Sequence, residues 1–293
     1  MSGLFGKKEK RYSEPIRWRR ELKLGPGYLL LTLWILFTFI LLGWVLLASF
    51  STTKEIFSNK LLDSGFHFEN YVKAWVNSNV STIFFNSLFY SFVSCTLLIV
   101  ICAPAAYALS RFDFVCNKLI QTGLVASMGV PVVMIVLPLF ALVAGLNNVT
   151  ANMATLIFLY IGINVPYTTI FLTTFFANLS RAFEEAAAID GCPPVKTFWL
   201  IMLPMAQPGI VTVTIFNFIN IWNEYFISLI FGNSDRVRPV AVGLYSMINS
   251  MKYTGDWAGM FAAVVIVFLP TFILYIFLSE KIIAGVTGGG VKG

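Results

Sequence analysis

Long apolar runs alternate with short polar stretches along this chain. A helix needs about 20 apolar residues to cross the ~30 Å hydrocarbon core of a bilayer. Six runs reach that length, at residues 28–50, 86–110, 119–144, 153–176, 207–231 and 259–282. A transmembrane β-barrel would instead show short segments of alternating polarity. The pattern predicts an all-α polytopic membrane protein with six transmembrane helices.

The composition agrees with this class. Hydrophobic residues make up 58% of the 293-residue chain and charged residues only 12%, against about 25% charged in soluble domains. The first run is longer than the apolar core of a signal peptide, and no small-residue cleavage site follows it. We expect residues 28–50 to remain in the mature protein as a helix.

The lysines and arginines predict the orientation of the spans. Most of the 20 precede the first run or fall in stretches that six spans place on the same side. The other side receives Lys54, Lys60, Lys73, Arg236, Arg238 and Lys252. Both termini are therefore expected in the cytoplasm. The net charge of +6 fits this topology and attraction to anionic lipid. Nucleic-acid binding is not expected, because no basic patch with interleaved aromatics lies away from the membrane flank.

The cysteines and the single histidine do not form a metal-ligand pattern. Cys95 and Cys102 fall inside the second run, and Cys116 and Cys192 fall on the predicted cytoplasmic side. Reduced thiols are the expected state. His67 falls in an outer loop, where a solvated side chain is expected rather than a ligand. The sequence predicts no metal site.

The stretch between the fourth and fifth runs is charged. It carries Arg181, Glu184, Glu185, Asp190 and Lys196. Each charge costs about 2.5–3.5 kcal/mol at the centre of a membrane helix. This stretch is therefore expected outside the bilayer.

The same stretch has the signals of two short helices over residues 180–203. Ser180 suits an N-cap, and Glu184 and Glu185 follow where the helix dipole favours negative charge. Phe183, Ala186, Ala187 and Asp190 share one small, mostly apolar face. Gly191 can adopt the left-handed conformation that ends a helix. Pro193 and Pro194 then suit the first turn of a second helix, which is expected to stop at Leu203-Pro204. An ordinary connecting loop is the alternative.

The spacing of these residues resembles a known signature. Glu185-Ala186-Ala187, three residues, Gly191, nine residues and Ile201-x-Leu203-Pro204 resemble the EAA signature of the permease subunits of ATP-driven, binding-protein-dependent importers. The extended form from Glu184 to Gly191 is similar to that of the sugar-uptake branch. Cys192 stands where the family often has alanine, and both residues are small.

Three further stretches carry the resemblance. AAYALSRFDF (105–114) and IWNEYF (221–226) are similar to family motifs. The ending AGVTGGGVKG (284–293), with Gly288, Gly289, Gly290 and Lys292, resembles the tail of the maltose permease G subunit and its relatives. The chain would then consist of a basic N-terminal segment (1–27), a permease domain (28–283) and this tail.

The resemblance implies a type I importer permease fold and a mechanism. The EAA helices of this family form a coupling helix that docks into a cytoplasmic ATPase subunit. The implied contact residues are Glu184, Glu185, Ala186, Ala187, Asp190, Gly191, Leu203 and Pro204. The implied partners are a second, different permease subunit, two ATPase subunits and an extracellular solute-binding protein. The tail would reach toward the ATPase subunits, with a flexible end as the alternative.

ATP chemistry is expected on the partner and not on this chain. Neither glycine-rich segment, GLFGKK or GVTGGGVKG, matches the G-x-x-x-x-G-K-[ST] phosphate loop. No nucleophile–base pair is evident on the cytoplasmic side. The chain is therefore expected to be a non-catalytic subunit that binds no cofactor, with ATP and Mg²⁺ on the ATPase subunit.

Polar residues in the fifth run suggest part of a solute pathway. Polar groups in a span face the bundle interior or a water-filled cavity, and Asn217, Asn220 and Glu224 are spaced along one helical face, with Asn223 nearby. Trp222 and Tyr225 could contact sugar hydroxyls. Helix–helix hydrogen bonding is the alternative, and in the resembled maltose system the partner subunit mainly holds the sugar.

Prolines interrupt the third and fourth runs, at Pro131, Pro138 and Pro166. They could be bending points during transport or static kinks. The outer loops, about 51–85 and 232–258, are rich in aromatic and turn residues, and by resemblance the second reaches into the binding protein. The predicted function is ATP-driven import of a sugar. Import of another polar solute (glycerol phosphate, a polyol or an acidic oligosaccharide) and secondary transport are the alternatives.

Overall fold

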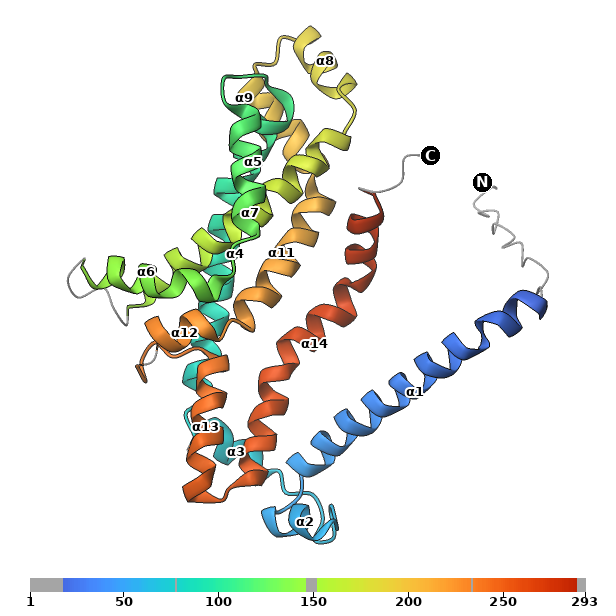
Figure 1. Cartoon of the computed structure of the whole chain (residues 1–293), viewed down its shortest axis with the longest axis vertical. Coiled ribbons are helices and arrows are strands. Elements are labelled where there is room, and N and C mark those ends of the chain that lie inside the picture. The colour runs from blue at the N-terminus through green and yellow to red at the C-terminus, as the bar shows by residue number, and fades with distance from the viewer. Residues whose placement is uncertain (1–17, 77, 146–151, 233, 289–293) are drawn as a thin grey trace, which may run out of the picture. The chain divides into compact units, whose positions relative to one another are not determined.

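The computed structural model describes residues 18–76, 78–145, 152–232 and 234–288, and every regular element in this part is a helix (Figure 1). The helices are α1 (Trp18–Ser49), α2 (Thr53–Ser58), α3 (Glu69–Val76), α4 (Val80–Arg111), α5 (Asn117–Met128), α6 (Val132–Ala144), α7 (Met153–Asn178), α8 (Ala182–Ile189), α9 (Pro194–Thr197), the π-helix η1 (Phe198–Met202), α10 (Leu203–Met205), α11 (Gln207–Trp222), α12 (Phe226–Phe231), α13 (Val240–Thr254) and α14 (Trp257–Gly288). The chain divides into two units, Met1–Leu47 and Ala48–Gly293. The prediction of an all-α membrane protein is confirmed.

The first unit contains most of α1. The stretch Leu24–Ser49 is long and apolar enough to cross a membrane, and the helix begins about ten residues before the predicted apolar run. Most of its described side chains are exposed, and Leu30 and Trp34 are each 69% exposed. A helix that is hydrophobic on all sides is typical of a membrane span.

The second unit contains the remaining candidate spans. α4, α7 and α14 each qualify as single helices. Two pairs of consecutive helices are long and apolar enough only when each pair is taken together. These are α5 with α6, bent by 103°, and residues 194–205 with α11, bent by 71°. By length and composition the described residues hold four single spans, or up to six if each bent pair is one span. Two of the six predicted spans are therefore not continuous helices.

The third predicted span breaks where Pro131 follows the end of α5. The N–H of Val130 bonds back to the carbonyl of Ser127 in α5 at 3.2 Å, and Pro131, which lacks an N–H, directly precedes α6. Proline disfavours helical backbone in the preceding residue as well. Pro138 and Pro166 lie inside α6 and α7, which continue through them. Of the three prolines noted in the sequence, Pro131 is the one at a large bend.

α11 begins at the first residue of the fifth apolar run, 207–231, and ends nine residues before the run does. Residues 194–205 approach it, and the chain bends at Ala206 before α11 begins. The π-helix η1 precedes this bend, and the N–H of Leu203 bonds to the carbonyl of Phe198. Pro204 has no N–H to continue an α-helical ladder, which accounts for the wider turn. α11 ends at Trp222, and α12 follows after a break.

α4, α7 and α11 form the centre of the second unit. Leu98 of α4 and Leu172 and Phe176 of α7 are fully buried. Gly209 lets α11 approach α7 closely, because an added Cβ would lie 2.6 Å from the Phe175 ring. The shorter helices of this unit are connected to this packed core.

The predicted outer loops are largely helical. They contain α2, α3 and α13, which Figure 1 places at the end of the second unit away from α8. Three side chains of α4 hold the segment that leads into α13. Asn86 donates to the carbonyls of Arg236 and Arg238, Ser87 accepts from the N–H of Val240, and the Tyr90 hydroxyl donates to the carbonyl of Val237. The start of α13 is therefore fixed to α4.

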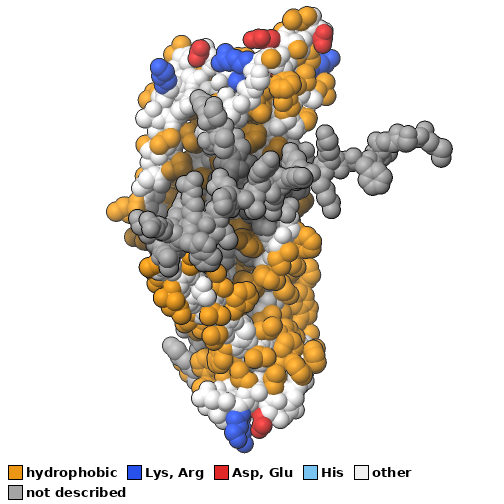
Figure 2. Space-filling model, turned by 90° about the vertical axis from the view of Figure 1, so that its right-hand side faces the viewer, with side chains coloured by type: hydrophobic (Ala, Val, Ile, Leu, Met, Phe, Trp, Pro, Cys, Tyr) orange, Lys and Arg blue, Asp and Glu red, His pale blue; other side chains and the backbone are white. Residues whose placement is uncertain are grey.

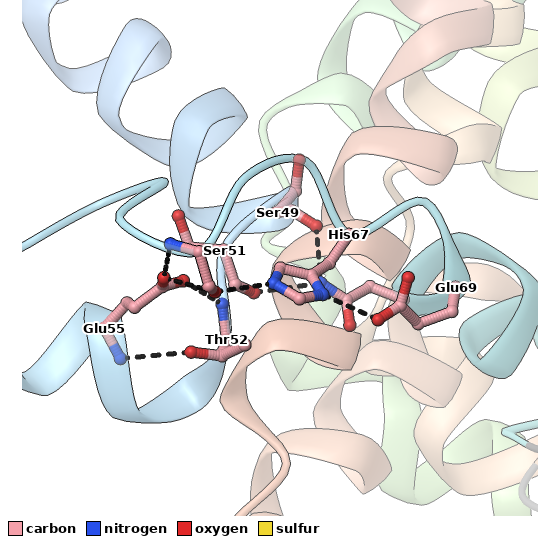
Figure 3. Close-up of polar contacts among 8 residues, drawn as sticks. Ser49, Ser51, Thr52, Glu55, His67 and Glu69 are labelled. Carbon is pink, nitrogen blue, oxygen red and sulfur yellow. Dashed lines mark hydrogen bonds and ion pairs between the residues drawn. The ribbon is translucent and has the colours of Figure 1, made fainter.

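A polar network closes the loop between α2 and α3 (Figure 3). Glu55 and Thr52 form a capping box at the start of α2, and Glu55 also accepts from the N–H and hydroxyl of Ser64. His67 contacts Ser64 at 2.8 Å and Glu69 at 2.6 Å. His67 is partly exposed, and these two contacts hold its ring. Within the described ranges, no group of three or more His, Cys, Asp and Glu side chains could hold a metal ion.

Candidate functional site

The charged stretch predicted outside the bilayer forms a helical hairpin at one end of the second unit (Figure 1). We call residues 180–205 the α8–α9 hairpin. It consists of α8, a turn around Gly191, and a second helix made of α9, η1 and α10. The second helix continues through Leu203 and Pro204 to Met205 and does not stop at Leu203-Pro204 as predicted, because the π-turn accommodates the proline.

The start of α8 uses the residues that the sequence indicates. The hydroxyl of Ser180 accepts the N–H of Ala182 at 3.3 Å. The N–H groups of Glu184 and Glu185 bond to the carbonyl of Arg181, and both carboxylates lie in the first turn. Negative charge in this position is favourable for the helix dipole. Ser180 thus caps this segment from the position before Arg181, the residue that directly precedes α8.

Gly191 ends α8 in the left-handed conformation, with φ +71°. The N–H of Cys192 bonds to the carbonyl of Ala187 at 2.8 Å, and the N–H of Gly191 bonds to that of Ala188 at 3.1 Å. This pair of bonds is the Schellman motif. Pro194 then occupies the first turn of α9, as the sequence predicts.

Most of the hairpin surface is open. Of the α8 side chains only Ala187 is buried, so the face predicted from Phe183, Ala186, Ala187 and Asp190 is mainly free. Ile189 is 87% exposed. Charged side chains gather over this end of the molecule (Figure 2). The exposed large apolar residues of the hairpin are Phe183, Ile189, Val195, Trp199 and Leu200.

One ion pair joins α8 to the end of α4. The Nε of Arg111 lies 3.2 Å from the Oε1 of Glu184, and the Arg111 guanidinium donates to the carbonyl of Leu179 at 2.7 Å. A cavity of about 260 Å³ lies beside the pair, lined by Tyr107, Arg111, Phe112, Arg181, Glu184, Ala188, Cys192, Pro194 and Thr197. The sequence motifs AAYALSRFDF and EEAAAIDG therefore meet in space.

The residues predicted for a solute pathway do not form one surface. Asn217 is fully buried and donates to the hydroxyl of Thr168 on α7 at 2.9 Å. Trp222 is 2% exposed, and its indole N–H donates to the carbonyl of Val267. Asn220 and Asn223 are exposed, and Glu224 and Tyr225 are partly exposed. The common helical face is absent because α11 ends at Trp222, before Glu224.

Glu224 has a local structural partner. Its Oε1 accepts the N–H of Ile227, and its Oε2 accepts both the N–H and the hydroxyl of Ser228. The carboxylate therefore satisfies the first N–H groups of α12. The Ser228 hydroxyl is also hydrogen-bonded to the hydroxyl of Tyr160 on α7, at 2.6 Å.

Comparison with known proteins identifies the family. Residues 96–282 match the model of the family described as "Binding-protein-dependent transport system inner membrane component". The chain belongs to this family. The match begins within α4 and includes all of α7, α11 and the α8–α9 hairpin.

Curated relatives align over most of their length. The diacetylchitobiose uptake system permease protein of Streptomyces coelicolor is 33% identical, with 90% of this chain and 87% of the relative covered. The sulfoquinovosyl glycerol transport system permease protein of Agrobacterium fabrum is 30% identical, covering 85% and 87%. The trehalose/maltose transport system permease protein of Thermococcus litoralis is 28% identical, covering 91% and 95%.

A solved structure shares the fold. The bacterial ABC transporter involved in the import of the acidic polysaccharide alginate matches with a TM-score of 0.79 at 21% identity, covering 91% of this permease and 98% of the matched chain. The resemblance drawn from the EAA signature is confirmed at the level of the family and the fold.

Some predicted features of the permease lie outside the described residues. Gly289, Gly290 and Lys292 of the tail do so, and Gly288 is the last residue of α14. The sequence reasoning missed the contact of Arg111 with Glu184. The only signal for it was an arginine just after the second apolar run, within the AAYALSRFDF motif, which had no assigned role.

Proposed function

We propose that this chain is the non-catalytic, membrane-spanning permease subunit of an ATP-driven importer. It passes a sugar or oligosaccharide from an extracellular binding protein into the cytoplasm by alternating access. The observation that carries the proposal is the α8–α9 hairpin, an ordered element that presents charged and large apolar side chains with nothing packed on them in the described chain. Exposed apolar residues beside charges are typical of a surface that a protein partner covers.

The partner of the hairpin is a cytoplasmic ATPase subunit, which supplies ATP and Mg²⁺. Glu184, Glu185, Ala186, Ala187, Asp190, Gly191, Leu203 and Pro204 belong to the docking element, and the tail at Gly288, Gly289, Gly290 and Lys292 reaches toward the same subunits. Glu185 and Asp190 are exposed and available for contact, whereas Glu184 is turned toward Arg111. The orientation from the lysine and arginine distribution supports a cytoplasmic hairpin and cytoplasmic termini in a bacterial inner membrane.

The complex contains two ATPase subunits and a second, different permease subunit. Large apolar side chains of α4, including Phe85, Phe89 and Phe92, are 49–71% exposed. These exposed side chains offer a surface along α4 that lipid and the second permease subunit can contact. The end with α2, α3 and α13 then faces the extracellular binding protein.

A carbohydrate is the solute that fits best. The named solutes of the curated relatives are sugars or sugar derivatives. The exposed polar residues after the middle of α11 are the amides Asn220 and Asn223, which suit hydroxyl groups. Glu224 is engaged with α12, so this region offers little charge to an ionic solute.

The test is to isolate the complex through a tag on this chain and reconstitute it in vesicles. We expect an ATPase subunit and a second permease to co-purify, and ATP to drive uptake of the ligand that mass spectrometry finds on the associated binding protein. Uptake in sealed vesicles without ATP would instead support a secondary transporter.

A further inference from the structure

Arg111 is the last residue of α4 and the basic residue of the AAYALSRFDF stretch. None of the functions described above uses this residue. Its guanidinium contacts both sides of the corner between α7 and α8. On one side it donates to the carbonyl of Leu179, just after α7 ends, and on the other it faces the carboxylate of Glu184 in the first turn of α8.

The contact is shielded from water. The side chain of Arg111 is 6% exposed and that of Glu184 is 20% exposed. Both facing atoms, Nε and Oε1, are buried, and neither makes a hydrogen bond to another group in the described chain. Removing one partner from such a pair leaves a buried charge without compensation, and this is strongly unfavourable.

α8 has few contacts besides this pair, and one of them is the hydroxyl of Tyr107 on α4, which interacts with the same Glu184 carboxylate. Ala187 is its only buried side chain, and this is the only ion pair of α8 in the described residues. The other helix of the hairpin is better anchored, because Thr197, Phe198 and Met202 are buried. Phe198 stacks near Tyr107 of α4, with ring centroids 5.1 Å apart. The angle of α8 therefore depends mainly on the polar contacts of Glu184, with Arg111 as the charged partner, while the second helix depends on packing.

We propose that Arg111 is a positioning residue that fixes α8 to α4 and transmits its displacement to the packed α4–α7 core. This inference rests on the proposed function, in which the ATPase moves the hairpin. Since α4 and α7 share a fully packed core, a force on α8 that passes through Arg111 reaches the spans directly. Without the ion pair, α8 would move on its own hinge at Leu179 and Ser180.

The test uses spin labels on the full chain in the assembled complex, with the native cysteines replaced. The first label pair, at Ile189 of α8 and Phe158 of α7, reports the position of α8; both sites are highly exposed. The second, at Phe158 and Phe272 of α14, reports movement of the spans. Distances are measured without nucleotide and after trapping with ATP and vanadate, and ATP hydrolysis is followed by phosphate release.

We expect Arg111→Gln and Glu184→Gln to broaden the α8 distance distribution without nucleotide. In Arg111→Gln, which lies outside the docking element, ATP hydrolysis should continue, while the population with shifted spans after trapping falls by about tenfold. Arg111→Lys should fall between, because lysine keeps the charge but lacks the planar fork. The exchanged pair Arg111→Glu with Glu184→Arg should restore part of the shift. Lys118→Gln, an exposed cation at the same end, is the matched control and should behave as wild type.

Wild-type distances and span movement in both single variants would overturn the positioning role. A broadened α8 with unchanged span movement would also overturn it, because α8 would then not need the ion pair to drive the spans. Failure of the proposed function gives a different result. In that case the wild-type complex would contain no ATPase, or trapping would leave its Phe158–Phe272 distance unchanged. The α8 distances measured without nucleotide would still show whether the ion pair holds α8 in position.

Discussion

The carboxylate of Glu224 caps α12 through Ser228, accepting its N–H at 3.0 Å and its hydroxyl at 2.6 Å. The other oxygen of Glu224 accepts the N–H of Ile227 at 2.8 Å. These hydrogen bonds determine the expected effect of Glu224→Gln. A glutamine replaces one acceptor oxygen by an NH₂ donor, which would then face an N–H group. The variant is therefore not a neutral replacement of shape.

We expect Glu224→Gln to destabilise the start of α12 by about 1–3 kcal/mol, the cost of leaving a buried polar group without its partner. Thermal unfolding and the yield of assembled complex should both decrease. Asn220→Ala, which changes an exposed side chain on α11, should leave both near wild type. Normal stability together with altered uptake in the Glu224→Gln protein would instead indicate that Glu224 is part of the solute pathway.

The turn at Gly191 allows a graded test of the coupling hairpin. Nothing lies within 4 Å of a Cβ added there, so the strain of a substitution comes from the positive φ. A side chain in this conformation costs about 1–2 kcal/mol, except for asparagine, which adopts it more readily. We therefore expect Gly191→Asn to retain ATP-driven uptake and Gly191→Val to reduce it strongly, with both proteins present in the membrane.

Gly123 provides the control for that series. It also has open space around its Cβ, but its backbone is helical. Gly123→Val should transport as wild type. Equal uptake by the asparagine and valine variants of Gly191 would show that the left-handed turn is not needed for coupling.

The loop between α2 and α3 should loosen in acid. Hydrogen bonds from the Ser64 hydroxyl and from the N–H groups of Thr52 and Ser64 lower the pKa of Glu55 from 4.5 to about 2. A lowered carboxyl pKa contributes stability above the unfolded value, and this contribution is lost as the pH falls from about 4.5 toward about 2. Amide hydrogen exchange over residues 52–64, corrected for intrinsic rates, should accelerate across that window.

Glu55→Gln is the control for this pH dependence. It removes the titrating group, so exchange in the loop should be faster at neutral pH and should lose its acid-dependent step. An acid step that persists in Glu55→Gln would assign the titration to another group of the network, such as the carboxylate of Glu69, whose pKa the hydrogen bond from His67 lowers.

The local signals at the hairpin predicted its structure well. Ser180, Gly191 and Pro194 act through neighbouring backbone groups, and these interactions can be read from spacing alone. The apolar runs likewise predicted the helices, because the length of a span is set by the bilayer.

The features that the sequence did not predict depend on contacts between distant segments. Arg111 and Glu184 are far apart along the chain, and nothing in either local pattern indicates the other. Asn217 and Asn220 share a helix, but one faces α7 and the other is exposed, which periodicity could not decide. The break after Trp222 lies at Asn223 and Glu224, polar residues that the sequence analysis assigned to a solute pathway, and the cap that Glu224 forms on α12 shows their structural role.

The orientation of the permease can be tested at two exposed positions. A cysteine placed at Tyr253, which is 92% exposed in α13, should react in intact cells with a thiol reagent that does not cross membranes. A cysteine placed at Lys196 in the hairpin should react only after the membrane is opened, because the lysine and arginine distribution places this end in the cytoplasm. The native Cys116 and Cys192 are replaced beforehand, since both lie toward the hairpin end. Labelling of Lys196→Cys in intact cells, with protection of Tyr253→Cys, would reverse the orientation and remove the hairpin from any cytoplasmic ATPase.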